Sequence, residues 1–245
     1  MKETTEKRSL LPPLLPSRSI LFLLIFLIGS AVTGKELADI SNWWSVAATL
    51  VNIVTVAAIV LLARKSGQSY KELINYKKGG RSVKKTILLV YGFVCVGMGG
   101  MYAAGFMFYG KFMPKVSVDI VAPIPAALAV INLILLPLTV PFAEDGLYLG
   151  CGVGKIRNSY AAVIISAFFY ALQHCFIPTM FDAKYMLYRF VSFLPAAVLF
   201  CVYFRKKKDP FAIMISHAIL DLATGVMIML TSVVPGLYDS WQSMV

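Results

Sequence analysis

Long uncharged apolar stretches alternate with short clusters of charge along the 245 residues of this chain. A transmembrane helix needs roughly 20 predominantly apolar residues, because about 30 Å of hydrocarbon is crossed at 1.5 Å per residue. Apolar segments lie at 19–34, 43–63, 86–110, 121–154, 160–176, 185–204 and 211–234. The pattern therefore predicts an all-α fold: a polytopic transmembrane helix bundle of about seven (seven to eight) helices, forming a single domain over residues 1–245.

The basic residues gather in particular loops. The loop between the second and third segments carries Arg64, Lys65, Lys71, Lys77, Lys78, Arg81, Lys84 and Lys85, and residues 205–208 after the sixth segment are all basic. Because Lys and Arg concentrate in cytoplasmic loops, these loops are predicted to be cytoplasmic, together with the basic N-terminal segment 1–18, which carries Lys2, Lys7, Arg8 and Arg18. The net charge of +11 is then explained by basic loops on the cytoplasmic side of the membrane. We expect an integral cell-membrane protein with lipids, and no nucleic acid, as partners.

The fourth apolar segment is rich in proline, with Pro123, Pro125, Pro137 and Pro141. Proline inside a helix removes a backbone donor and kinks or restarts the helix. Lipid offers no hydrogen-bond partner, so the freed backbone groups must be satisfied within the protein or in a wet cavity. We therefore expect a cavity near Pro141, among the last four segments.

Ionisable side chains lie inside these last four segments, where they are costly. They are Glu144, Asp145, His174, His217 and Asp221, and they include both histidines of the chain. An acid or imidazole within a membrane segment is by default a candidate functional group. His217 and Asp221 are four residues apart and share a helix face, as do Tyr170 and His174. Each pair is thus expected to point into one cavity.

The depth of these groups follows from a rise of 1.5 Å per residue, counted from the basic loops. Glu144 and His217 come out roughly level, whereas His174 comes out one to two helical turns further along. A kink at Pro141 or a deeper start of the fifth helix must absorb that difference. An acid and two imidazoles meeting below the membrane surface would suit activation of water by a general base, with neighbouring donors for an oxyanion. The reaction expected from such a site is peptide hydrolysis.

At these residues the chain resembles the CPBP family of intramembrane proteases, which includes the Rce1-type CAAX prenyl endopeptidases and the bacterial Abi proteins. The acidic motif of that family, two glutamates followed four places on by an arginine, is similar to residues 141–150. Its second motif, an aromatic residue four before a histidine, matches Tyr170 and His174. Its third, a histidine with Asn or Asp four later, matches His217 and Asp221. Residues 116–234 are therefore the predicted motif-bearing core.

The resemblance also implies roles for these residues. Glu144, assisted by His174, would activate a water molecule, and His217 with Asp221 would support the oxyanion. Asp145 and Tyr170 would give further support. The scheme uses no metal and no cofactor. It predicts a metal-independent glutamate-type endopeptidase that acts on a membrane-associated peptide or a lipidated protein.

Three positions depart from the family pattern. Asp145 replaces the second glutamate, Leu149 occupies the arginine position, and Asp221 stands where Asn is more frequent. Without the arginine the paired carboxylates lack their usual counter-ion, so one must be protonated or paired with another group. An alternative is therefore a catalytically degenerate member that acts as a membrane scaffold or immunity-type protein.

Two other function classes also use such residues. Asp, Glu and His inside a bundle can form the proton relay of a transporter, but the chain has no evident inverted repeat. Two histidines and three acids could bind zinc, but the chain lacks an HExxH motif. The leading hypothesis remains the intramembrane endopeptidase.

Overall fold

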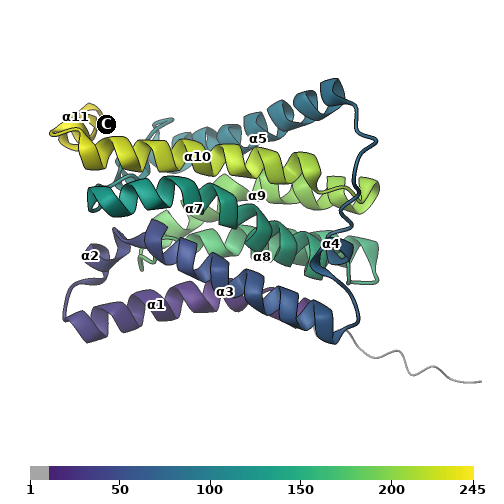
Figure 1. The fold of residues 1–245 in the computed structure, drawn as a ribbon. Coiled ribbons are helices and arrows are strands. Elements are labelled where there is room, and N and C mark those ends of the chain that lie inside the picture. The colour runs from purple at the N-terminus through teal and green to yellow at the C-terminus, as the bar shows by residue number, and fades with distance from the viewer. Residues whose placement is uncertain (1–10) are drawn as a thin grey trace, which may run out of the picture.

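The computed structural model describes residues 11–245, which form a bundle of roughly parallel helices (Figure 1). Within these residues six helices are long and apolar enough to cross a membrane. They contain α1 (Ser17–Thr33), α3 (Trp44–Lys65), α5 (Val83–Tyr109), α7 (Ala126–Asp145), α9 (Ala183–Lys207) and α10 (Phe211–Val233). The span of α1 begins at Pro12 and the span of α7 continues to Val153. The expected all-α polytopic bundle is thereby confirmed.

The fifth predicted segment is shorter than the others. It forms α8 (Ser159–Leu172) and continues into the 3-10 turn η3 (Gln173–Cys175), so that the apolar helix ends inside the bundle. Asn158 caps its first turn by accepting from the backbone N–H groups of Tyr160 and Ala161. The early end of the helix leaves Gln173 and His174 buried at its tip.

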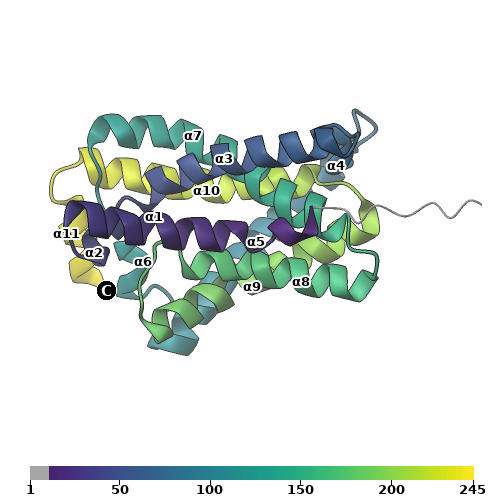
Figure 2. The ribbon, with the colours of Figure 1, turned by 90° about the horizontal axis from the view of Figure 1, so that it is seen from below.

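The short helices mark the two ends of the bundle. Figures 1 and 2 place α2 (Leu37–Ser41), α6 (Lys115–Asp119) and α11 (Leu237–Met244) at one end, and α4 (Tyr70–Leu73) at the other. The two strongly basic loops meet at the α4 end, where Asn75 donates to the carbonyl of Lys208 and Arg81 pairs with Asp209. The clustering of basic loops expected from the sequence is thus present at one end. Lys2, Lys7 and Arg8 lie outside the described residues.

The irregular stretch of the fourth segment begins just after its prolines. Pro137 and Pro141 lie inside α7, which stays helical through both, and a π-helix, η2 (Gly146–Val153), follows without a break. The wider turn redirects the chain immediately after the two acids. Irregularity of this kind is frequent at functional sites.

A side chain of α4 completes the backbone hydrogen bonding at this junction. Tyr70 Oη donates to the carbonyl oxygen of Phe142 at 2.7 Å, so a polar group at this depth is satisfied within the protein. The approach requires a glycine, because a Cβ at Gly146 would lie 2.6 Å from Tyr70 Oη. Tyr70 therefore fixes the turn from α7 into η2.

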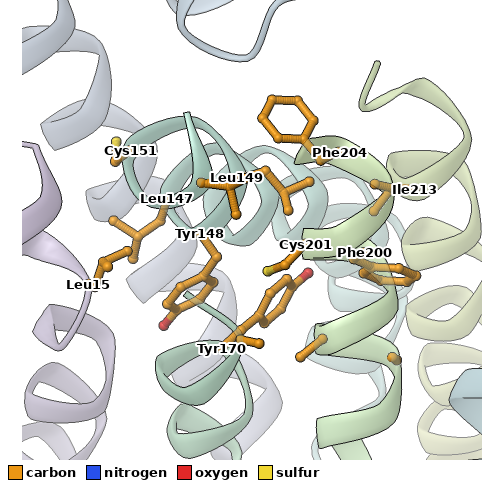
Figure 3. Packing of buried hydrophobic residues seen from close by; sticks show 14 of the residues in the cluster. Leu15, Leu147, Tyr148, Leu149, Cys151, Tyr170, Phe200, Cys201, Phe204 and Ile213 are labelled. Atoms are coloured by element: carbon orange, nitrogen blue, oxygen red, sulfur yellow. The ribbon is translucent and has the colours of Figure 1, made fainter. Parts of the chain in front are cut away.

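The main apolar core surrounds η2. Figure 3 shows this cluster, in which the rings of Tyr148 and Tyr170 stack at 4.5 Å between centroids. Leu149 is fully buried in the same cluster, together with Phe204 and Ile213. Because this packing holds η2 against α8, α9 and α10, it also fixes the position of Tyr170 beneath the polar groups described next.

Candidate active site

A cavity of about 250 Å³ lies among α5, α7, α8, α9 and α10. Five of the six residues identified from the sequence line it: Glu144, Tyr170, His174, His217 and Asp221. The rest of its wall is mainly apolar, with side chains such as Met101, Phe193 and Leu220. The sixth residue, Asp145, is joined to this group through Tyr170. The bundle thus brings acids and imidazoles from distant stretches of sequence to one cavity.

Glu144 occupies the last turn of α7 and is only 3% exposed. Both of its carboxylate oxygens accept hydrogen bonds, Oε1 from Arg18 Nη2 at 2.8 Å and Oε2 from Gln173 Nε2 at 2.7 Å. His217 Nε2 lies 3.6 Å from Oε2. The carboxylate is therefore held from one side and faces an imidazole on the other.

His217 of α10 is oriented by a short hydrogen-bonded chain. Tyr170 Oη donates to Asp145 Oδ1 at 2.8 Å and lies 3.0 Å from His217 Nδ1. A tyrosine hydroxyl has one proton to donate, so its oxygen accepts from the Nδ1–H of His217. The second oxygen of Asp145 is also close, at 3.6 Å from Nδ1. This chain directs the other ring nitrogen, Nε2, towards Glu144.

Asp221 lies one turn beyond His217 on the same face of α10, as the spacing predicts. Its Oδ2 is 3.6 Å from His217 Nε2, and this oxygen has no hydrogen-bond partner among the described residues. Nε2 is thus equidistant from two carboxylates, Glu144 and Asp221. A protonated His217 would offset part of the negative charge of both.

His174 shares the cavity but makes different contacts. Its ring stacks on Phe193 with centroids 3.5 Å apart, and its Nδ1 donates to the carbonyl of Tyr170 at 3.0 Å. Nε2 of the neutral imidazole is then an acceptor. No hydrogen bond or ion pair links His174 to Glu144 within residues 11–245. Instead Gln173, one residue earlier, makes that contact.

Arg18 and Gln173 were not identified from the sequence as site residues. Arg18 was assigned to the basic cytoplasmic segment 1–18, whereas the structure buries it completely in the second residue of α1. The sequence before Arg18 could have indicated its burial, because the apolar run already begins at the leucines of residues 10–15. Arg18 therefore lies inside an apolar stretch, where a charge requires a partner.

The position that matches the family's arginine has apolar surroundings in the structure. Leu149 has no exposed surface and belongs to the apolar cluster around Phe204. The guanidinium beside Glu144 comes instead from Arg18 on the first spanning helix. The second buried arginine, Arg189, donates to the carbonyls of His174 and Ile177 and so fixes the chain after η3.

The chemistry of the site is that of acids, imidazoles and two guanidinium groups, Arg189 on the cavity wall and Arg18 paired with Glu144. Within residues 11–245 no group of three His, Cys, Asp or Glu side chains is arranged to hold a metal ion. Glu144, His217 and Asp221 all line the cavity, and His217 Nε2 is 3.6 Å from each carboxylate, so a water molecule there could contact all three side chains. Such a water would meet one candidate base and one candidate proton donor.

Comparison with known proteins gives one family. Residues 126–223 match the family model Rce1-like, described as type II CAAX prenyl endopeptidase Rce1-like. The matched region runs from the start of α7 into α10 and contains every residue that the sequence analysis assigned to the site. No curated protein and no solved structure matched the chain.

Proposed function

We propose, from the premise that this chain belongs to the Rce1-like family, that it is an intramembrane endopeptidase which hydrolyses a peptide bond in a membrane-associated peptide or lipidated protein. One observation carries the proposal. Glu144 presents a carboxylate on the wall of a largely apolar cavity, 3.6 Å from His217. A buried base beside a proton donor is the arrangement that general acid–base hydrolysis requires.

In the proposed reaction Glu144 is the general base. It removes a proton from a water molecule held between Oε2 and His217 Nε2, and the water oxygen attacks the carbonyl carbon of the peptide. The carbonyl π electrons move to oxygen and form a tetrahedral oxyanion. The C–N bond then breaks as the protonated Glu144 returns its proton to the leaving amine, which restores the carboxylate.

The oxyanion requires donors that are in place before it forms. His217 Nε2–H is the nearest candidate, because the chain through Tyr170 to Asp145 supports the protonated ring. Asp221 beside it can donate only when protonated. When ionised, it stabilises the imidazolium instead. We assign His174 to the cavity wall, where its Nε2 is available to the substrate or a water molecule.

The apolar wall supports a substrate that already resides in the membrane. Ligand sites are usually apolar with a few placed polar groups, and this cavity is lined by residues such as Met98, Met101 and Phe193. We further propose that the α4 end, with its basic loops, faces the cytoplasm. In that orientation the N-terminus is cytoplasmic and the chain acts as one transmembrane domain.

Cleavage assays with purified full-length protein in liposomes test this function. A panel of membrane-spanning and lipidated peptides is incubated with wild type, Glu144→Gln and the matched control Glu72→Gln, and the products are identified by mass spectrometry. Glu72 is exposed at the α4 end, where it caps a short helix. Loss of a general base costs about 10²- to 10⁴-fold in rate. We expect that loss for Glu144→Gln alone, and undiminished cleavage by this variant would refute the proposal.

A further inference from the structure

We propose that Arg18 is a positioning residue that holds the carboxylate of Glu144 towards the cavity, so that the N-terminal helix α1 is a working part of the active site. The inference rests on the proposed function. Arg18 lies 126 positions before Glu144 in the sequence, yet its Nη2 is 2.8 Å from Glu144 Oε1. Within residues 11–245, no other arginine or lysine pairs with Glu144.

The guanidinium makes three hydrogen bonds in different directions. Besides Nη2 to Glu144, its Nε donates to Gln173 Oε1 at 2.6 Å and its Nη1 donates to Thr55 Oγ1 at 3.3 Å. The partners belong to α7, η3 and α3 respectively. A planar fork with fixed donor directions is required to reach all three, and a lysine ammonium does not have that geometry.

Gln173 closes the arrangement into a ring. Its Oε1 accepts from Arg18, and its Nε2 donates to the second carboxylate oxygen of Glu144 at 2.7 Å. The guanidinium therefore controls Oε1 directly and Oε2 through Gln173. A carboxylate held at both oxygens cannot rotate away from His217, which lies 3.6 Å from Oε2.

The location of Arg18 separates a positioning role from direct catalysis. Its side chain has no exposed surface, and among the described residues it is not part of the cavity wall. It contacts Glu144 Oε1, whereas the imidazole of His217 is closest to Oε2. Glu144 is also its only ion-pair partner within residues 11–245. Arg18 thus acts on the reaction through Glu144 and does not touch the substrate.

The charge of Arg18 has a second effect on Glu144. The two side chains form a buried ion pair, and burial strengthens the attraction between opposite charges. This attraction adds to the hydrogen bonds that hold the carboxylate in place. The orientation of the base therefore depends on a residue of α1.

The test compares Arg18→Met and Arg18→Lys with wild type in the liposome assay. Misplacing a catalytic group by about 1 Å can cost on the order of 100-fold in rate. We expect Arg18→Met to lower kcat by about 100-fold while KM changes by less than about threefold, because the cavity wall is unchanged. Arg18→Lys keeps the charge but loses the fork, and we expect an intermediate kcat.

Arg81→Met is the matched control, because it removes an arginine from an arginine–carboxylate pair at the α4 end, away from the cavity. We expect it to cleave as wild type does. Wild-type kcat in Arg18→Met, beside an inactive Glu144→Gln, would overturn the role of Arg18 and leave the proposed function standing. A proportional loss in Arg18→Met and Arg81→Met, without partial recovery in Arg18→Lys, would also overturn it, because both would then report general stability.

A measurement without cleavage separates the two proposals. Thermal unfolding of wild type, Arg18→Met, Glu144→Gln and the double variant in detergent reports whether the two side chains interact. We expect the double variant to unfold at a higher temperature than Arg18→Met alone, because no unpaired carboxylate remains. Additive effects would show that the pair does not form, whether or not any peptide is cleaved. If Arg18→Met does not fold, the neutral polar substitution Arg18→Gln takes its place in both measurements.

Discussion

Two arginine–carboxylate pairs of the same length lie in different surroundings. Arg18 and Glu144 approach to 2.8 Å with side chains that are 0% and 5% exposed, in the interior of the bundle. Arg81 and Asp209 also approach to 2.8 Å, but their side chains are 18% and 28% exposed at the α4 end. Burying charges is costly, and breaking a buried pair leaves one charge without compensation. The comparison teaches that solvent access, more than distance, decides what each pair contributes.

The interior pair is expected to show the largest effect on stability. Arg18→Met leaves the buried carboxylate of Glu144 without its counter-ion, and breaking such a pair costs about 3–5 kcal/mol. We expect a loss of this size in the free energy of unfolding, measured by reversible denaturation in mixed detergent micelles. A loss below about 1 kcal/mol would make the interior pair no different from the pair at the α4 end.

Tyr170 tests the next contact in the interior. Tyr170→Phe removes the hydroxyl that joins Asp145 to His217 and leaves a buried carboxylate oxygen without its donor, at a cost of about 1–3 kcal/mol. We expect a loss of stability in this range together with slower cleavage. Tyr160→Phe, at an exposed tyrosine, is the matched control and should be neutral in both measurements. Equal effects of the two substitutions would contradict the role of this hydroxyl.

The exposed pair should be much less sensitive. Arg81→Met removes two hydrogen bonds to Asp209 and a stacking contact on Phe211, yet partly exposed pairs are worth at most about 1 kcal/mol. We expect a fall of that size in the free energy of unfolding and unchanged cleavage. A larger fall than in Arg18→Met would invert the comparison.

The smallest effect concerns pH. Hydrogen bonds from the Arg81 guanidinium hold the pKa of Asp209 below its ordinary value of 3.8. A carboxyl group whose pKa is lowered by folding adds stability above its unfolded pKa, and that stability disappears as pH falls through the folded value. The difference in unfolding temperature between wild type and Arg81→Met should therefore be constant above about pH 5 and shrink below about pH 4. A difference that persists unchanged at pH 3 would assign it to packing.

The sequence predicted the helical bundle because length and hydropathy alone decide which segments cross a membrane. Helix periodicity also placed His217 and Asp221 on one face, and the depth count put Glu144 level with His217, which is consistent with the 3.6 Å separation. The catalytic roles of these residues remain predictions. Both inferences depended on regular helix geometry, in which the rise and the rotation are the same for every residue.

The contacts that the sequence did not predict arise where that regularity ends. The π-helix η2 follows Asp145. A count based on α-helix periodicity does not predict the direction of the chain through such a helix. At η3 the helix tightens into a 3-10 turn. Gln173 therefore contacts Glu144, where His174 was expected, and His174 stacks on Phe193. Arg18 was missed for another reason, because one basic residue near the start of an apolar run has the pattern of a topology signal.

The origin of Arg18 in α1 bears on how the protein is made. Synthesis runs from the N-terminus, so of the helices that supply the candidate site, α1 with Arg18 enters the bilayer before α7, and α10 with His217 and Asp221 enters after both. Until α10 arrives, Glu144 has its counter-ion but no imidazole from that helix to face. The proposed catalytic group would therefore be complete only after α10 has packed against α7.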